Sequence, residues 1–385
     1  MDHAPDAQSS SAGPRLSVLV VSHLYPSPES PGRGSFVQDQ CRALAEHCDV
    51  TVVTGRWGAA QRTDTSDGPV RVLSVPLLSP TGLPSQARVV AAIPGYTRAV
   101  LDVMRTLDTR PDLIHANFAM PDGVAAVRAG ARANVPVVVT LLGSDFNRQM
   151  SRPLSGPFVA RSIGRADAVI AVSRQIAEGL AAREPQLAHR IEFIPNGYNS
   201  ELYHYEPKPA HGPFLFVGSF TPVKNPLVLV QAFGLIAPRT SRELVMIGRG
   251  HLQPEIERAI TELGLTDRVR LPGRVTLEQL RSYFRDAGVF VLPSATEGMP
   301  LVVIESLATG TPVVGSAVGA IPDLVVPGVS GYLVEPGDVE DLAEALLKAE
   351  KTAWDNAAIA EGAPVIDWAE NARRVMAVYR RVIDR

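Results

Sequence analysis

Short apolar segments rich in Val and Ile alternate along the chain with longer segments of helical periodicity. Each apolar segment is a continuous run rather than an alternation of apolar and polar residues. The runs form two series, at residues 16–21, 50–54, 113–115, 135–141 and 168–172, and then at residues 214–217, 244–247, 269–271, 289–292 and 313–314. Continuous apolar strands separated by helices are typical of parallel sheets covered on both faces. The pattern therefore predicts an α/β protein with two doubly wound, Rossmann-like domains.

A polar segment separates the two series. Residues 199–212 read NSELYHYEPKPAHG, and the strand pattern restarts directly after them. For a chain of 385 residues, two cores are more natural than one. We expect an N-terminal domain over residues 15–200, a C-terminal domain over residues 201–364, and a helix over residues 365–385 that can cross back to the first domain. Because such sheets bind ligands at the carboxyl ends of their strands, the site is expected in a cleft between the domains.

Composition narrows the functional classes. Apolar residues make up 45% of the chain and the formal net charge is −3, so no general attraction to nucleic acid is expected. The only cysteines, Cys41 and Cys48, lack a zinc-site spacing, and we expect reduced thiols in a cytoplasmic protein. Residues 1–14 are expected to form a disordered tail. No uncharged apolar run is long enough to span a membrane.

Two arginine-containing segments suit contact with an anionic membrane surface. Residues 88–107 carry Arg88, Arg98 and Arg105 among apolar residues. A second basic run consists of Arg148, Arg152, Arg161 and Arg165. The plainer alternatives are packing against the core for the first segment and a solvated face for the second. Peripheral contact with the inner face of a membrane is therefore an open alternative, and it would suit a lipid-linked acceptor.

The most informative segment is PSATEGMPLVVIESLATGTP, residues 293–312. Pro293 ends an apolar run, Pro300 suits the first position of a helix, and Gly310 suits its end. The unpaired N–H groups near residues 299–302 and the positive end of the helix dipole together form a site for a phosphate or diphosphate. Such a site requires no metal ion.

Two acids lie in this segment. Glu297 precedes the helix, where it could reach the hydroxyls of a sugar beyond the phosphates. Glu305 lies further in among apolar residues, where ribose hydroxyls would satisfy its carboxylate. Alternatively, Glu297 interacts only with the helix dipole and Glu305 faces solvent. The neighbouring motifs favour the sugar-nucleotide interpretation.

The string EGMPLVVIESLATGTPVVGSAVGAIPDLV resembles the signature of retaining family 4 glycosyltransferases. These have the GT-B architecture, in which two Rossmann-like domains face each other across a cleft. Three more strings resemble that family in matching order: GRGSFV at residues 32–37, IPNGYN at residues 194–199 and FVGSFTPVKNP at residues 216–226. The resemblance covers residues 15–385.

This resemblance implies a glycan or glycoconjugate biosynthetic enzyme. It would move a hexosyl-type sugar, with retention of configuration, from a nucleoside-diphosphate donor to an acceptor hydroxyl. UDP is the expected nucleotide, and neither a metal ion nor another cofactor is expected. The acceptor could be a sugar, a lipid-linked carrier or a small metabolite.

The resemblance also implies roles for individual residues. Glu297 should contact the donor sugar, Glu305 the ribose and Lys224 the diphosphate. Further expected donor-site residues are Gly34, Ser219, Arg274, Gly298, Met299, Pro300, Leu301 and Val302. The contacts at Arg274 are expected from its main chain, and Gly34 would allow close backbone approach to a ligand.

The chain departs from the family pattern at three positions. Ser219 stands where relatives usually carry arginine, Leu142 where many carry histidine, and Asn117 replaces one histidine of an H-x-H pair. Asp145 and His115 are then the remaining candidates for orienting sugar or acceptor hydroxyls. Their alternatives are a turn-closing role for Asp145 and a structural imidazole for His115.

Other functional classes fit less well. A dehydrogenase is disfavoured because Val37 and Gln253 occupy the third glycine position of the two Gly-x-Gly strings. A single-domain, metal-dependent transferase is disfavoured because no Asp-x-Asp triplet occurs. A sugar-nucleotide epimerase, or a non-catalytic sugar-nucleotide-binding protein of the same architecture, is the remaining alternative, because fold alone does not separate it from a transferase.

Overall fold

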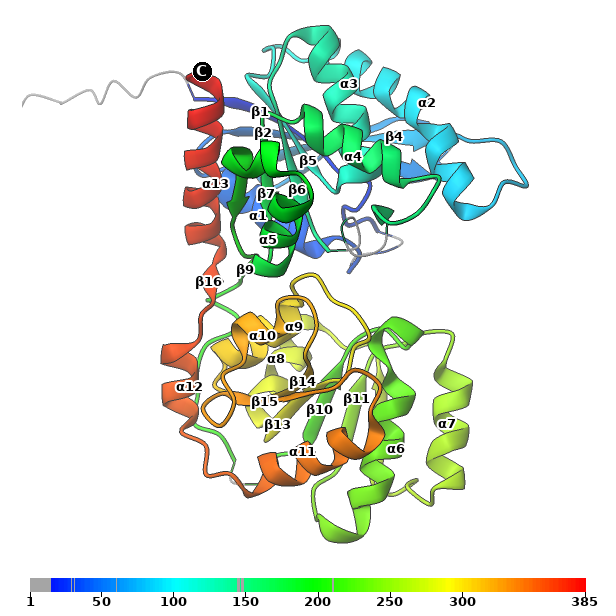
Figure 1. Cartoon of the computed structure of the whole chain (residues 1–385), viewed down its shortest axis with the longest axis vertical. Coiled ribbons are helices and arrows are strands. Elements are labelled where there is room, and N and C mark those ends of the chain that lie inside the picture. Colours follow the sequence, from blue (N-terminus) through cyan, green and yellow to red (C-terminus); the bar gives the residue numbers. More distant parts are fainter. Residues whose placement is uncertain are drawn as a thin grey trace, which may run out of the picture.

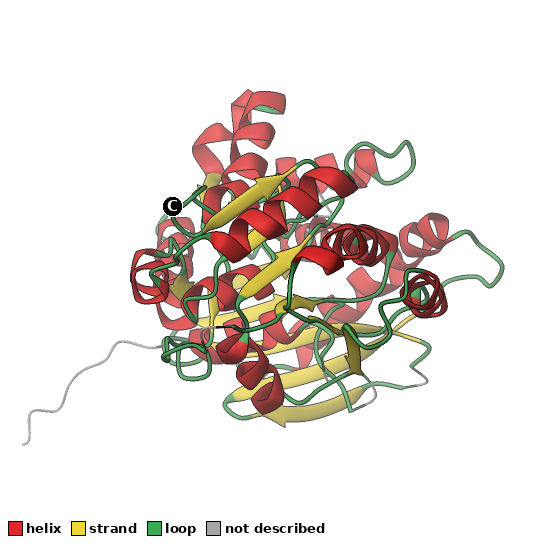
Figure 2. Cartoon of the chain, turned by 90° about the horizontal axis from the view of Figure 1, so that it is seen from below, coloured by secondary structure: helices red, strands yellow, loops and turns green. Residues whose placement is uncertain are grey.

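Two α/β domains make up the chain in the computed structural model (Figure 1). The structure describes residues 15–385 except residues 29, 31, 60, 144, 145, 147, 148 and 210. The expected tail over residues 1–14 and the candidate Asp145 therefore lie outside the described residues. Helices lie on both sides of the strands when the molecule is seen from below (Figure 2). The predicted fold class, two doubly wound domains, is confirmed.

The N-terminal domain is built on an eight-stranded sheet in the order β3-β4-β2-β1-β5-β6-β7-β8. Its strands are β1 (Ser17–Val21), β2 (Asp49–Trp57), β3 (Thr63–Asp67), β4 (Val70–Leu77), β5 (Leu113–Asn117), β6 (Val137–Leu141), β7 (Ala168–Ala171) and β8 (Ile191–Phe193). Its α-helices are α1 (Ser35–Leu44), α2 (Ser85–Thr106), α3 (Val124–Ala133), α4 (Gly156–Arg165) and α5 (Arg174–Arg183). All strand pairs are parallel except β3 with β4. The β3–β4 hairpin was not predicted, because β3 is a largely exposed polar strand, TDTSD.

The C-terminal domain contains a six-stranded parallel sheet in the order β12-β11-β10-β13-β14-β15. Its strands are β10 (Phe214–Val217), β11 (Leu244–Ile247), β12 (Val269–Gly273), β13 (Val289–Leu292), β14 (Val313–Ser316) and β15 (Gly331–Val334). Its α-helices are α6 (Pro226–Ile236), α7 (Gln253–Glu262), α8 (Leu277–Asp286), α9 (Leu301–Ala308), α10 (Ile321–Leu324), α11 (Val339–Lys351) and α12 (Asn356–Gly362). The sequence does not predict the edge strand β15, because only four residues form it and two of them are half-buried.

Two segments connect the domains, and they pair with each other. β9 (Gly197–Tyr198) follows the first sheet, β16 (Ile366–Asp367) precedes the last helix, and the two form a parallel two-stranded sheet. A Cβ atom on Gly197 would lie 2.7 Å from the Cα atom of Trp368, so only glycine allows the two segments to come this close. We call this pair the double crossing.

The last helix, α13 (Trp368–Ile383), packs against the N-terminal domain (Figure 1). The Asp367 carboxylate caps it by accepting a hydrogen bond from the N–H of Glu370 at 2.7 Å. Its apolar face joins a core cluster with β1 and α1, in which Val375 and Tyr379 are fully buried. The buried Asn371 side chain accepts a hydrogen bond from Gln40 of α1. Residues from the end of the chain therefore complete the core of the first domain.

His115 lies at the centre of this junction. Its ring is fully buried on β5, with Nε2 2.7 Å from Thr140 Oγ1 and Nδ1 2.6 Å from Tyr379 Oη. Burial lowers the pKa of His115 to about 4, so the ring is neutral at pH 7 and donates one hydrogen bond while it accepts the other. Both ring nitrogens are thus occupied by the protein itself. The expectation that His115 orients an acceptor hydroxyl is corrected: its contacts are those of a structural imidazole.

Replacing Tyr379 by Phe should lower the free energy of unfolding by about 1–3 kcal/mol, because a buried nitrogen of His115 then loses its partner. Urea denaturation at pH 7 measures the change. The matched control is Tyr332→Phe, which removes a hydrogen bond to Thr352 at a half-buried position and should have a smaller effect. Equal losses in both variants would contradict a special role for the buried contact.

Candidate active site

The segment after β13 forms the predicted loop and helix. β13 ends at Leu292 and α9 begins at Leu301. The sequence predicts Pro300 as the first helical residue, whereas in the structure it is the N-cap residue, so the helix begins one position later than predicted. No side chain caps this helix. The N–H groups of Val303 and Ile304 bond to the carbonyl oxygen of Pro300. The first turn, with Leu301 and Val302, therefore presents main-chain N–H groups and the positive end of a helix dipole without a competing cap.

Lys224 and Glu297 form an ion pair beside this helix start. Glu297 Oε1 accepts hydrogen bonds from Lys224 Nζ and from Ser294 Oγ, both at 2.6 Å. The side chains of Lys224 and Glu297 are only 21% and 9% exposed, so water screens the pair poorly. The N–H of Ala295 donates to the carbonyl oxygen of Val223 at 2.9 Å and joins the two loops. The structure therefore brings together two of the predicted donor-site residues from segments 73 positions apart.

Glu305 occupies a less polar environment than Glu297. It lies within α9, and burial together with the nearby carboxylate of Asp39 raises its pKa to about 8. Asp39 belongs to α1 of the other domain, so its negative charge acts on Glu305 across the domain contact. Burial also raises the pKa of Asp39, and the negative charge of Asp67 adds to the effect. Glu305 is therefore mostly protonated at pH 7, and it is not a freely solvated helix residue.

Two glycine backbones touch at the domain contact. A Cβ atom on Gly298 would lie 2.0 Å from the carbonyl oxygen of Leu142, and one on Gly143 would lie 2.4 Å from the Cα atom of Gly298. Gly143 also has a φ of 113°, which favours glycine. On the far side of Gly298, its carbonyl oxygen accepts a hydrogen bond from Ala320 at 2.9 Å. The donor-site loop thus touches the loop that leads to Asp145, whose role stays a prediction.

Met299 connects this contact to the double crossing. Its side chain is buried, and its Sδ atom accepts a hydrogen bond from the N–H of Asn196 at 3.1 Å. The Asn196 side-chain amide also donates to the carbonyl oxygen of Met299 at 3.4 Å. The side chain of Met299 therefore belongs to the domain contact. Only the main chain of Met299 is then available to bind a ligand.

An arginine that the sequence analysis did not select lies beside Ser219. Arg249 directly follows β11, and its carbonyl oxygen accepts a hydrogen bond from the N–H of Phe220 at 3.0 Å. Its guanidinium Nε would lie 3.3 Å from a Cβ atom on Gly273, at the end of β12. The nearby residues Ser219 and Arg274 are both exposed. In the sequence, Arg249 lies between the two glycines of the second Gly-x-Gly string, which does not by itself indicate a cation at the carboxyl end of the sheet.

Gly34 is required by the protein's own backbone. It precedes α1 with a φ of 81°, and a Cβ atom there would lie 2.6 Å from the carbonyl carbon of Leu24. Close approach to a ligand had been expected at this position. The structure shows that the loop after β1 folds back onto Gly34, and a ligand contact there stays a prediction.

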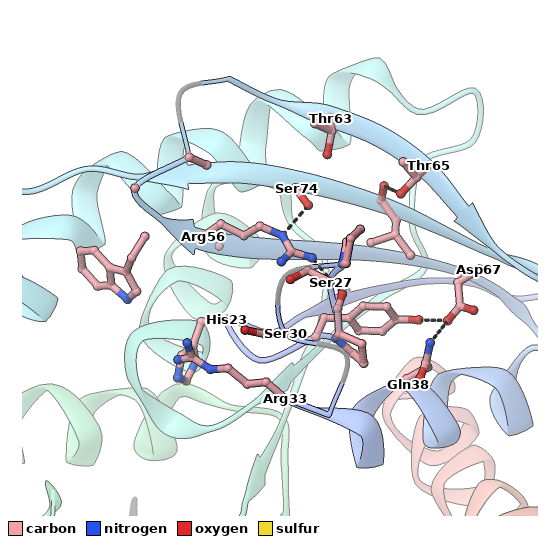
Figure 3. A pocket seen from close by; sticks show the side chains of 18 of the residues that line it. His23, Ser27, Ser30, Arg33, Gln38, Arg56, Thr63, Thr65, Asp67 and Ser74 are labelled. Carbon is pink, nitrogen blue, oxygen red and sulfur yellow. Dashed lines mark hydrogen bonds between the residues drawn. The ribbon is translucent and has the colours of Figure 1, made fainter. Parts of the chain in front are cut away.

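The N-terminal domain has a pocket of about 1100 Å³ on its strand-end side. The loop after β1 and the ends of β2, β3 and β4 line it, and Figure 3 shows Arg33, Arg56 and His23 among its side chains. Arg56 donates hydrogen bonds to Ser74 Oγ and to the carbonyl oxygen of Pro26, both at 2.9 Å. The sequence analysis missed this pocket, because one wall is the unpredicted β3–β4 hairpin.

Hydrogen bonds fix the walls of this pocket. Asp67 Oδ2 accepts from Tyr25 Oη at 2.7 Å and from Gln38 Nε2 at 2.8 Å, which joins the hairpin to α1 (Figure 3). His23 Nδ1 lies 2.6 Å from Oδ2 of Asp122. Burial raises the pKa of Asp122, although His23 opposes this shift. The polar side chains of the pocket are therefore held in place before any ligand binds.

Among the residues that the structure describes, no group of three or more His, Cys, Asp and Glu side chains could hold a metal ion. Across the same described ranges, no helix is both long and apolar enough to cross a membrane.

Comparison with known proteins decides the family. The "Glycosyltransferase Family 4" profile matches residues 32–202, and the "Glycosyl transferases group 1" profile matches residues 208–364. The putative teichuronic acid biosynthesis glycosyltransferase TuaC of Bacillus subtilis is 31% identical over 366 residues, which cover 87% of this chain and 89% of that protein. This chain belongs to the group 1 glycosyltransferases. The enzyme class and the family predicted from the acidic segment are confirmed.

Other relatives agree with this assignment. This glycosyltransferase is 30% identical over 309 residues to the D-inositol 3-phosphate glycosyltransferase of Streptosporangium roseum, with 70% of this chain and 69% of that protein covered. The sucrose-phosphate synthase structure from Thermosynechococcus elongatus has a TM-score of 0.75 at 22% identity, covering 96% of this chain and 99% of that one. Anabaena HepE in complex with UDP has a TM-score of 0.69 at 19% identity, covering 95% and 100%. The fold of the glycosyltransferase is therefore GT-B.

Replacing Gly298 by Ala should lower kcat/KM by about 10²-fold, because the new methyl group would push the two domains apart at the site. Steady-state transfer kinetics and small-angle scattering measure the two effects, and the variant should be more extended than the wild type. Gly95→Ala in α2 is the matched control, because a Cβ atom there meets nothing within 4 Å. Wild-type kinetics for Gly298→Ala would contradict a closed contact in the working enzyme.

Proposed function

We propose that this glycosyltransferase moves a hexosyl-type sugar from a UDP-linked donor to an acceptor hydroxyl, with retention of configuration and without a metal ion. The observation that carries the proposal is the Lys224–Glu297 pair beside the uncapped start of α9. Solved relatives support the choice of nucleotide, because HepE is described in complex with UDP and with UDP-glucose.

The donor diphosphate binds at the start of α9 in this proposal. Main-chain N–H groups of Gly298, Met299, Leu301 and Val302 and the helix dipole stabilise its negative charge, and Lys224 adds a full positive charge. Arg249 supplies a second cation from the neighbouring strand end, near the place where Ser219 replaces the usual arginine. Charge that develops on the leaving group is then stabilised by groups already in position.

Glu297 positions the donor sugar. Its Oε1 accepts hydrogen bonds from Lys224 and Ser294, and hydroxyl groups of the sugar donate to the carboxylate when the donor binds. When the diphosphate draws Lys224 towards itself, the pair with Glu297 links the phosphate and sugar ends of the donor. The sugar is thereby held beside the domain contact.

Transfer proceeds on one face of the sugar. The acceptor hydroxyl attacks the anomeric carbon from the side of the departing diphosphate, the bond from that carbon to the phosphate oxygen breaks, and a leaving phosphate oxygen takes the hydroxyl proton. No side-chain nucleophile and no histidine base are needed, which suits Leu142 and the occupied ring of His115. Closure at Gly143 and Gly298 excludes water from the reacting atoms.

The pocket of Figure 3 holds the acceptor. It lies on the first domain, at the strand ends that face the donor domain, and its volume of about 1100 Å³ accommodates a sugar-sized group. Cationic and hydroxyl side chains line it, among them Arg33, Arg56 and Thr65. Such a lining suits a polar acceptor. The names of the relatives refer to teichuronic acid and to inositol 3-phosphate, both of which are polar and anionic.

The direct test combines UDP-sugars with a panel of polar acceptors and measures UDP release. Release that depends on the acceptor supports transfer, whereas acceptor-independent interconversion of the donor would show an epimerase. Glu297→Ala should lower kcat/KM by about 10²–10³-fold, because sugar positioning is lost in the transition state. Glu335→Ala, an exposed acid of the same domain, is the control and should retain wild-type rates.

Donor binding should release up to about one proton at pH 7. Free Glu305 has a pKa near 8, and ribose hydroxyls that donate to its carboxylate would stabilise the ionised form and lower that pKa. UDP affinity should therefore rise as the pH increases towards 8 and then level off. Calorimetry in buffers of different ionisation enthalpy measures the released protons. Release that is unchanged in Glu305→Gln would assign the proton to another group.

A further inference from the structure

His23 is one of the side chains that line the pocket of Figure 3. It lies two residues after the end of β1, and its side chain is 18% exposed. Its Nδ1 lies 2.6 Å from Oδ2 of Asp122, a residue 99 positions further along the chain. One edge of the ring is therefore bound to the interior of the domain. The opposite edge, which carries Nε2, is turned towards the pocket.

Asp122 is fully buried in the short helical turn that precedes α3. Its Oδ1 lies 3.2 Å from Tyr96 Oη, and the main-chain N–H of His23 donates to the same carboxyl group. Burial raises the pKa of Asp122, whereas the contacts with His23 and Tyr96 lower it. These partners favour the ionised carboxylate. Because an ionised carboxylate only accepts hydrogen bonds, Nδ1 of His23 is the donor in this pair.

The contact with Asp122 determines the role of the second ring nitrogen. When Nδ1 carries the proton, Nε2 of a neutral imidazole is a hydrogen-bond acceptor. A carboxylate that holds one nitrogen in this way fixes both the tautomer and the orientation of the ring. The buried acid therefore sets the chemistry of the ring edge that faces the pocket.

A strained residue holds the same ring from the side. Phe118 directly follows β5 and has a φ of 80°, which is uncommon for a residue with a Cβ atom. Its ring centre lies 4.9 Å from that of His23, and the ring of Phe36 from α1 lies 6.4 Å from Phe118 on its own account. Such backbone strain persists only where the surroundings hold it, and it clusters at functional sites. It is thus a second, independent observation that the orientation of His23 matters.

His115 in the same domain shows what a purely structural histidine looks like. Its ring is fully buried, and both of its nitrogens have partners in the core, Thr140 and Tyr379. His23 instead has one nitrogen on a buried acid and a partly exposed ring in the wall of a pocket of about 1100 Å³. The surroundings of His23 are those of a ligand-binding imidazole.

We propose that Nε2 of His23 accepts a hydrogen bond from a hydroxyl group of the sugar acceptor, and that Asp122 and Tyr96 position the ring for this contact. This inference rests on the proposed function, which places the acceptor in the pocket of Figure 3. It identifies the acceptor as a polyol or a sugar, held through a hydroxyl group. His23 takes no proton from the acceptor, so the transfer step remains as described above.

The test is steady-state transfer from UDP-glucose to D-inositol 3-phosphate and to methyl glucoside. His23→Asn keeps an amide N–H near the place of Nδ1, which can still donate to Asp122, but it has no group at the place of Nε2. This variant should lower kcat/KM for the acceptor by about 10- to 30-fold, mainly through KM, because one hydrogen bond to the acceptor is lost. The KM for UDP-glucose and the melting temperature should stay at their wild-type values. His47→Asn, the same change at an exposed position of the same domain, is the control and should keep wild-type kinetics.

A double-mutant cycle tests the positioning role of Asp122. Asp122→Asn should lower kcat/KM for the acceptor in the wild-type background, because the amide no longer fixes the tautomer of His23. In the His23→Asn background the same change should have little further effect on acceptor kinetics. Additive losses in the double variant would contradict this role.

Further variants distinguish an acceptor contact from support of the fold. If His23→Asn melts well below the wild type, His23→Ala and His23→Gln are compared instead. The amide of glutamine reaches the place of Nε2, so His23→Gln should recover about tenfold of the kcat/KM for the acceptor that His23→Ala loses. Equal acceptor kinetics in these two variants would overturn the proposal.

Two other outcomes would also overturn it. Wild-type acceptor kinetics in a folded His23→Asn variant would reject the contact and leave the proposed function intact, as would equal losses for donor and acceptor. If the wild-type enzyme releases no more UDP with either acceptor than without one, the proposed function fails, and the inference about His23 fails with it.

Discussion

Contact between two glycine backbones sets the geometry on which the rest of the molecule depends. Gly143 and Gly298 belong to different domains, and neither leaves room for one more carbon atom. Because backbone meets backbone, the loop before α9 and the loop after β6 come closer than side chains would allow. The Lys224–Glu297 pair and the uncapped start of α9 lie on one side of that contact. Their function as a donor site requires the opposing domain to be this near.

The short distance between the two domains also determines the electrostatic interactions at their contact. Glu305 and Asp39 come from opposite domains, and each lies in an environment that disfavours its charged form. Two such acids destabilise the closed form when both are ionised, so at neutral pH protonation of one of them permits the contact. A ligand with hydroxyl groups can also stabilise an ionised acid at this contact, because its hydroxyls donate hydrogen bonds to the carboxylate. Closure and ligand binding are thereby coupled through ordinary carboxyl chemistry.

The sequence was sufficient for the fold because strands buried on both faces are continuous apolar runs. It did not predict β3, β4, β8 or β15. β3 is polar, β8 and β15 are short and only partly buried, and the apolar residues of β4 are interrupted by Arg71, Ser74 and Pro76. The pocket beside the β3–β4 hairpin was missed with them. Glu297 and Glu305 could be selected as candidates, because a helix start with neighbouring acids is a local pattern, whereas Lys224 was selected from the family resemblance. The roles of all three stay predictions. The two alternatives for His115 could not be separated from the sequence, since its partner Tyr379 is 264 residues away. Arg249 likewise could not be selected, because its place beside the ends of β10 and β12 is defined only by the tertiary structure.

The position of α13 has a consequence for how the protein is made. The core around β1 and α1 contains Val375 and Tyr379 from the end of the chain. A ribosome releases those residues only after the entire second domain has been synthesised. The core of the N-terminal domain therefore stays incomplete while the C-terminal domain is synthesised and folds first. Biosynthesis thus reverses the usual order in which the leading domain is finished first.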